Sequence, residues 1–206
     1  MRGRSADGTP IKDDSLIFLT ESDSEWMKDL GVILGKPDEP LGYSFYARWI
    51  PEKPDHGQWY ANIGYQFTDS FRGGIDYRPV TGDVSLLANW RVISEDDSWR
   101  PALIVGSSND EFGGINSQSY YATLSKHVGS IGDANFSIYG GGTYIEELSE
   151  LRPVGGLHVS HGPWSGMFIY SGVDPHISVS RKLGNHTVSF LMFDMELLGM
   201  AYGFSF

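Results

Sequence analysis

From Leu41 onward, large apolar residues recur at every second position, with small or polar residues between them. Residues 41–49 and 59–67 follow this pattern, and the segment between them is rich in proline and glycine. Because successive side chains of a strand point to opposite faces, each run predicts a strand with one apolar and one polar face. The intervening segment predicts that the two strands form a hairpin.

The same pattern continues to the end of the chain. Further runs cover residues 75–78, 84–92, 101–107, 119–128, 135–145, 154–160, 167–172, 176–182, 187–194 and 199–206. The short segments between them are rich in turn-forming residues, which predicts up-and-down hairpins. The pattern therefore predicts 12 antiparallel strands, and two further runs before residue 41 would make 14.

The last eight residues alternate most regularly. Met200, Tyr202, Phe204 and Phe206 are separated by small residues. A terminal Phe preceded by aromatic residues at every second position resembles the last strand of Gram-negative outer-membrane β-barrels. The resemblance extends over residues 41–206 through the alternating strands and points to no specific family. It implies an all-β, up-and-down transmembrane barrel in the bacterial outer membrane, inserted by the barrel-assembly machinery through its C-terminal strand.

The residue types on the two faces of the predicted strands help to distinguish a membrane barrel from a soluble one. A soluble barrel buries its large apolar side chains and exposes its charges, whereas a membrane barrel does the reverse. We expect the polar face to line a lumen with Arg48, Asn62, Gln66, Asp76, Arg78, Asn89 and Arg91. We expect the apolar face to carry a membrane girdle of Trp49, Trp59, Phe67, Trp90, Tyr202, Phe204 and Phe206. A soluble lipocalin-like or sandwich fold stays open as an alternative, and it would place Arg78 and Arg91 outside.

Residues 1–40 have a different pattern and form the first of two predicted regions, before the barrel of 41–206. Residues 22–35 carry a capping-box pattern and apolar residues at helical spacing, which predicts an amphipathic helix. Such a helix could lie at the membrane surface or plug the lumen, and an extra strand is the alternative. Residues 1–5 are not followed by an apolar segment, so we expect a mature chain or a start inside the precursor.

Composition narrows the possible partners and cofactors. The net charge is −11 with only 15 Lys and Arg, which argues against a nucleic-acid partner. The chain has no cysteine, and its histidines lack metal-ligand spacing, so we expect no metal and no cofactor. No apolar run is long enough for a membrane helix. We expect a monomer whose partners are membrane lipid and small solutes.

Three functions fit this sequence. The lumen residues, above all Asp76 and Arg78, could form a narrow porin-like channel that selects small solutes by charge, or a salt-bridge network that fills the barrel. A closed structural barrel in an envelope or polysaccharide-export assembly is the alternative. His158 and Ser160 resemble the His-x-Ser pair of outer-membrane lipid hydrolases, although His161 replaces the usual Asn and the nearest acid is Asp174. Whether the protein is an enzyme stays open, and ordinary lumen-lining roles for these two residues are expected.

Overall fold

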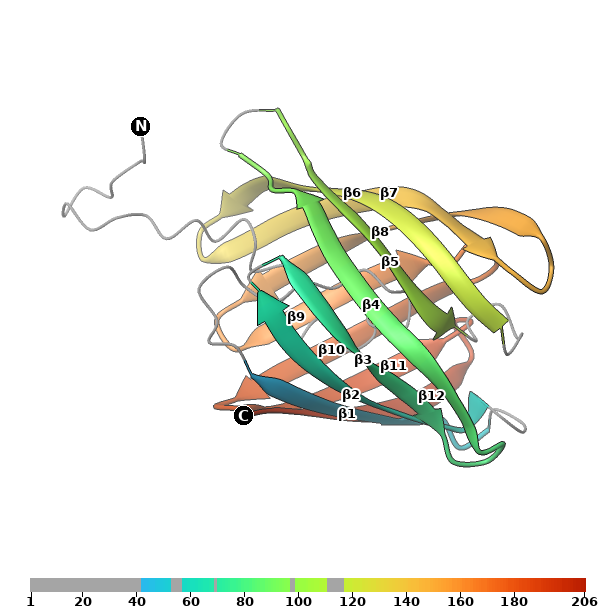
Figure 1. Cartoon of the computed structure of the whole chain (residues 1–206). Helices are drawn as coiled ribbons and strands as arrows, with labels where there is room; N and C mark the ends of the chain where they lie inside the picture. The colour runs from blue at the N-terminus through green and yellow to red at the C-terminus, as the bar shows by residue number, and fades with distance from the viewer. Residues whose placement is uncertain (1–41, 53–56, 69, 97–98, 111–116) are drawn as a thin grey trace.

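A computed structural model of the chain describes residues 42–52, 57–68, 70–96, 99–110 and 117–206. The described residues form a closed antiparallel β-barrel (Figure 1). Its strands are β1 (Tyr43–Trp49), β2 (Trp59–Thr68), β3 (Phe71–Arg78), β4 (Asp83–Ile93), β5 (Ala102–Asp110), β6 (Ser117–Ile131), β7 (Ala134–Ile145), β8 (Glu150–His161), β9 (Trp164–Tyr170), β10 (Pro175–Leu183), β11 (His186–Phe193) and β12 (Leu197–Ser205). The predicted number of 12 strands from residue 41 onward is confirmed. The helix predicted at 22–35 lies outside the described residues.

Each strand pairs with its neighbours along the chain, and β1 pairs with β12 to close the ring. At the seam the backbone N–H of Tyr43 donates to the carbonyl of Phe206, and the N–H of Phe206 donates to the carbonyl of Tyr43. Closure leaves the barrel without an exposed strand edge. The described residues contain no helix that is long and apolar enough to cross a membrane.

The barrel has two rims, which we name by the position of the C-terminus. The terminal rim holds Tyr43 and Phe206 and lies at the left of Figure 1. It also holds the tight turns at 132–133, 162–163 and 184–185. The opposite rim holds the connections that follow β1, β3, β5, β7, β9 and β11. Consecutive strands run in opposite directions, so odd-numbered strands end at the opposite rim and even-numbered strands end at the terminal rim. The position of a residue within its strand therefore shows which rim it lies near.

Inward and outward positions alternate along the strands as the sequence predicts. In β2 and β11 almost every second residue is buried, and the residues between them are partly or fully exposed. The exposed positions carry large apolar side chains, for example Ile63, Leu86 and Phe190. Most of the buried positions on the same strands are polar or small. The barrel wall thus has an apolar outer face and a predominantly polar inner face.

Two inward-facing glycines make room for long neighbouring side chains. A Cβ atom at Gly64 would collide with the guanidinium group of Arg72. A Cβ atom at Gly106 would collide with the hydroxyl oxygen of Tyr121. These glycines therefore allow Arg72 and Tyr121 to lie along the inner wall across a neighbouring strand.

The strand boundaries differ from the predicted ones mainly where glycine interrupts the alternation. Strand β3 begins at Phe71, not at residue 75, because Gly73 and Gly74 continue the ladder with β2. A side chain at Gly74 would collide with the backbone of β2, so the position is closely packed and not a turn. The earlier start of β3 adds Arg72 to the inner wall.

Candidate functional site

All seven residues predicted to line a lumen face the barrel interior and are buried. They lie on β1–β4, and Arg78 is only 2% exposed. Arg72 joins them and is equally buried, although the sequence prediction missed it. The buried residues on the inward face of β1–β4 therefore include four arginines and one aspartate, a set that we call the arginine wall: Arg48, Arg72, Arg78, Arg91 and Asp76.

Toward the opposite rim, the arginine wall is organised around Tyr60. Its hydroxyl donates a 2.6 Å hydrogen bond to Oδ1 of Asp76. The guanidinium carbon of Arg48 lies 5.1 Å from the Tyr60 ring centroid, and that of Arg78 lies 5.9 Å from it. Arg48 also lies 5.1 Å from the ring of Phe193, which belongs to β11. Cation–π contacts and a carboxylate thus offset part of the cost of burying these charges.

Toward the terminal rim, a second part of the arginine wall contains Arg72, Asn89 and Arg91. Arg72 and Asn89 are paired in register, and Arg91 follows Asn89 on the same face of β4. The guanidinium group of Arg72 donates to Oγ of Ser44. The hydroxyl of Tyr121 reaches across Gly106 and donates to Oδ1 of Asn89. This contact fixes the Asn89 carboxamide, so that its two N–H donors point away from Tyr121.

The inner face of β8–β11 carries a row of hydroxyl groups that crosses all four strands. Four serines, one from each strand, are paired in register and buried, and we call them the serine row: Ser160, Ser165, Ser180 and Ser189. The hydroxyl oxygens of Ser180 and Ser189 lie 2.8 Å apart in a hydrogen bond. Ser189 is in register with Ala201, and Ala201 with Arg48, so the row meets the arginine wall at β12.

Several buried polar atoms in the interior have no hydrogen-bond partner among the described residues. They include Oδ1 of Asn62, Nδ2 of Asn89, Oγ1 of Thr123 and the hydroxyl of Tyr139. A buried polar group without a partner costs free energy, roughly 1–3 kcal/mol for each group. The inner face is therefore suited to groups that bring their own hydrogen bonds, such as water or a polar solute.

The predicted hydrolase residues face the interior, with Ser160 in the serine row. His158 and Ser160 are both buried on β8, near the terminal rim. Asp174, the acid suggested by the sequence, lies in the connection between β9 and β10 at the opposite rim. His158 is in register with Met167 at the middle of β9, whereas Asp174 follows the end of that strand, and no described contact joins the two residues.

The predicted girdle residues project from the outer face. Most of them are well exposed, and Trp49 and Phe204 are partly exposed. Trp49 stacks on Trp59 near the opposite rim, with ring centroids 5.6 Å apart. At the terminal rim, Tyr43 stacks on Phe206 with a centroid distance of 5.8 Å. Aromatic side chains thus gather on the outer face near both rims.

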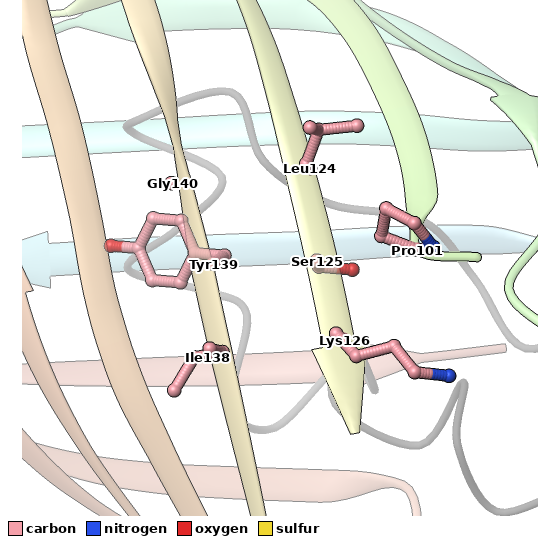
Figure 2. Close-up of a pocket in the computed structure, with 7 residues that line it drawn as sticks. All are labelled: Pro101, Leu124, Ser125, Lys126, Ile138, Tyr139 and Gly140. Carbon is pink, nitrogen blue, oxygen red and sulfur yellow. The ribbon is translucent and has the colours of Figure 1, made fainter. Parts of the chain in front are cut away.

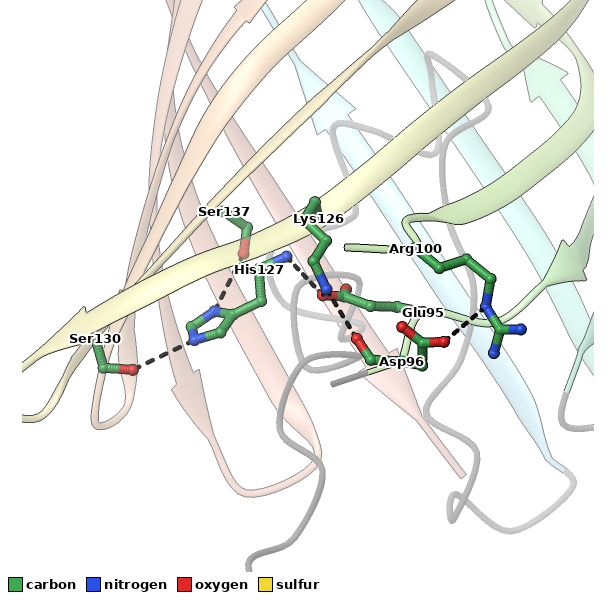
Figure 3. Close-up of polar contacts among 7 residues, drawn as sticks. All are labelled: Glu95, Asp96, Arg100, Lys126, His127, Ser130 and Ser137. Atoms are coloured by element: carbon green, nitrogen blue, oxygen red, sulfur yellow. Dashed lines mark hydrogen bonds and ion pairs between the residues drawn. The ribbon is translucent and has the colours of Figure 1, made fainter. Parts of the chain in front are cut away.

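An ion-pair cluster lies at the terminal rim, outside the arginine wall (Figure 3). The ammonium group of Lys126 lies 2.7 Å from a carboxylate oxygen of Glu95, and it donates to the carbonyl of Asp96. The same Glu95 oxygen accepts the backbone N–H of His127, and Arg100 pairs with Asp96. These contacts tie the connection after β4 to β6 and neutralise Glu95 locally.

A pocket of about 320 Å³ lies along β6 and β7 (Figure 2). It is lined by Pro101, Leu124, Ser125, Lys126, Ile138, Tyr139 and Gly140. Leu124 and Ile138 are exposed apolar side chains, in contrast to the buried polar residues of the interior. The pocket is therefore separate from the arginine wall.

The described residues hold no cluster of histidine, aspartate and glutamate that could bind a metal ion. No protein-family model matches the chain, and a comparison with curated proteins finds no match. Function must therefore be argued from the two faces of the barrel wall and from the charges of its interior.

Proposed function

We propose that the protein spans the bacterial outer membrane and forms a narrow channel for small solutes. The observation that carries this proposal is the distribution of polarity across the wall, with apolar side chains outside and charged and hydroxyl side chains inside. A soluble barrel would require the opposite arrangement. The proposed partners are membrane lipid around the wall, the barrel-assembly machinery during insertion, and small solutes inside the barrel.

Charge on the outer face supports the membrane location. Among the outward-facing strand residues whose side chains the structure describes, only Lys126 and Arg181 belong to the charged types Lys, Arg, Asp and Glu. Both lie in the half of the barrel near the terminal rim, and Arg181 lies 5.0 Å from the ring of Trp164. Long basic side chains and aromatic rings near a rim are typical of the interface between membrane and water.

The aromatic residues of the outer face support the same orientation. Near the opposite rim they include Trp59, Tyr77, Tyr120, Tyr144 and Tyr170. Near the terminal rim they include Phe67, Phe71, Trp90, Trp164 and Phe206. Aliphatic residues such as Ile63 and Val179 lie between them. Two aromatic belts around an aliphatic band are a feature of membrane barrels.

The interior supports a channel over a barrel filled only by its own side chains. Buried polar atoms of Asn62, Asn89 and Thr123 lack partners among the described residues, and water or solute would supply them. The serine row offers small side chains and hydroxyl groups on the other side of the lumen. The near-complete burial of the inner residues limits the proposed passage to small solutes.

A closed structural barrel is the second candidate, because the same burial favours it. Arg48, Arg78 and Ser189 are almost inaccessible to solvent, as they would be in a barrel that admits nothing. A role in an envelope or export assembly would then depend on contacts that partner proteins make with the two rims. The hydrolase function gains no comparable support and stays a prediction for His158 and Ser160.

Two measurements on the purified full chain test the proposal. A folded membrane barrel migrates faster in an unheated detergent gel than after boiling, and we expect this shift. In planar bilayers we expect discrete conductance steps. Conductance steps without a gel shift would contradict the barrel, whereas a shift without conductance would leave the closed structural barrel. Solubility without detergent together with an unshifted band would contradict the membrane location.

A further inference from the structure

A buried histidine contacts the turn that joins β11 to β12 at the opposite rim. His176 is the second residue of β10, faces the interior and is 0% exposed. Its ring packs on Phe193, the last residue of β11, with ring centroids 5.0 Å apart. The turn itself comprises residues 194–196. The proposed channel leaves this histidine without a role.

The backbone of this turn has an unusual conformation. Asp194 and Met195 both have positive φ angles, of 52° and 59°. Residues other than glycine rarely adopt this conformation, and it persists where surrounding contacts enforce it. One such contact is the N–H of Glu196, which donates to the carbonyl of Phe193 at 2.8 Å. Another is the N–H of Asp194, which donates to Nδ1 of His176 at 3.0 Å and so ties the turn to β10.

The Nδ1 atom of His176 faces both a donor and an acceptor of Asp194. Besides the backbone N–H, the carboxylate oxygen Oδ1 of Asp194 lies 3.3 Å from this nitrogen. A neutral imidazole with its proton on Nε2 accepts a hydrogen bond at Nδ1, whereas an imidazolium donates at both nitrogens. Protonation therefore removes the acceptor of the backbone N–H and gives the carboxylate a donor. The protonation state of the ring decides which of the two bonds forms.

The charged groups near the ring come from several elements. The Asp194 side chain is 35% exposed and contacts the ring nitrogen, and an opposite charge at this distance favours the imidazolium form. Arg48 of β1 lies on the other side of Phe193, 5.1 Å from that ring. Further titratable residues in this part of the described interior and rim are Asp174 before β10, Glu196 in the turn, and His158 on β8 and Tyr139 on β7, beyond Ile169 of β9.

From these contacts we infer that His176 is a pH-sensitive switch that holds the turn between β11 and β12. In its neutral form the ring accepts the backbone N–H of Asp194. In its imidazolium form the ring releases that N–H and pairs with the Asp194 carboxylate. Phe193 contacts both His176 and Arg48, so the exchange reaches the arginine wall. The inference rests on the proposed channel for its effect on passage, and it adds that the conductance changes with pH.

The first test follows the switch by nuclear magnetic resonance, with the full chain folded in detergent micelles. During a titration from neutral to acidic pH, we expect Nδ1 of His176 to become protonated and the Asp194 amide proton to shift with the same midpoint. His176→Asn offers a carboxamide oxygen that accepts the N–H and does not titrate, so this shift should be lost. His186→Asn is the matched control, because His186 bonds to Tyr202 on the outer face and should not affect the turn.

The second test removes the carboxylate and keeps the backbone N–H. In Asp194→Asn, we expect the pH at which His176 takes up its proton to fall by about one unit, a roughly tenfold loss of proton affinity. Asp174→Asn is the matched control, because it removes a carboxylate two residues before His176 that makes no described contact with the ring. It should shift the midpoint less. Equal shifts in the two variants, or a wild-type Asp194 amide that does not follow the ring, would overturn the switch.

The third test measures conductance in planar bilayers on either side of the titration midpoint. We expect the wild-type and His186→Asn proteins to conduct differently at the two pH values, and His176→Asn to lose that difference. The gel shift checks that each variant is folded. Equal pH dependence in wild type and His176→Asn would overturn the effect on passage and leave the channel. A switch detected by magnetic resonance in a protein without conductance would overturn the channel and keep the switch.

Discussion

Inward and outward residues alternate in the same way on β1–β4 and on β8–β11. The inward side chains of these two regions nevertheless differ in length and in charge. On β1–β4 the inward side chains are long, and Arg48 extends from β1 to the Phe193 ring of β11. On β8–β11 the serine row ends at Oγ atoms close to the strands, as in the bond between Ser180 and Ser189. If the barrel conducts as proposed, we therefore expect the route to follow the serine row, while the arginine wall supplies the field that acts on it.

The two walls also stabilise the fold by different means. A buried guanidinium group carries a large desolvation cost, which the Tyr60 ring and the Asp76 carboxylate partly offset. A buried hydroxyl costs far less and is satisfied by one neighbour. Substitutions on the arginine wall should therefore change stability more than substitutions on the serine row, where large side chains should instead block passage.

The largest expected effect is on conductance, when the space beside the serine row is filled. Ser180→Leu should remove most of the single-channel conductance, because a branched apolar side chain would enter the route. Ser85→Leu makes the same substitution on the arginine-wall side, where Ser85 is in register with Asp76. It should leave most of the conductance in planar bilayers. Equal losses in the two variants would show that the route does not follow the serine row.

A smaller effect, on stability, is expected at the centre of the arginine wall. Asp76→Ala removes the carboxylate that accepts the Tyr60 hydroxyl and lies among the arginines. We expect the free energy of unfolding to fall by about 2–3 kcal/mol, as for other hydrogen bonds to charged groups. Urea titration of the folded protein in detergent micelles measures this change. Asp83→Ala, at the end of the same pair of strands, is the control and should cost less, since Asp83 is only partly buried.

The smallest expected effect comes from a single hydroxyl. Ser189→Ala removes the 2.8 Å bond to Ser180 and should lower the free energy of unfolding by about 0.5–1 kcal/mol. The same urea titration measures it, with Ser205→Ala at the end of β12 as the control. A loss as large as that of Asp76→Ala would contradict the difference in stabilisation between the two walls.

The number of strands and the orientation of their faces could be predicted because alternation is a local property. Residues such as Asp76 and Arg78 were placed on the inner face from their positions within one run. Arg72 was missed because the glycines at 73 and 74 interrupt the apolar series, so the third strand was started too late. The position of Arg72 over Gly64 depends on a neighbouring strand, which one run of sequence does not reveal.

The serine row was not predicted as a unit, because it depends on register between strands. The turn at 162–163 brings Ser160 opposite Ser165, and the turn at 184–185 brings Ser180 opposite Ser189. Hairpin register follows from loop length, so these two tight turns carried a usable signal. The contact between Arg48 and Phe193, by contrast, depends on ring closure between β1 and β12 and had no such local signal.

Pairing of β1 with β12 also has a consequence for the order of events during folding. These two strands are the most distant in sequence, whereas every other pair is joined by a connection along the chain. Contacts between distant segments form slowly, because a long stretch of chain must be confined before they are gained. The seam between Tyr43 and Phe206 should thus be the last to form. Until then, both end strands present unpaired backbone groups that can join another chain.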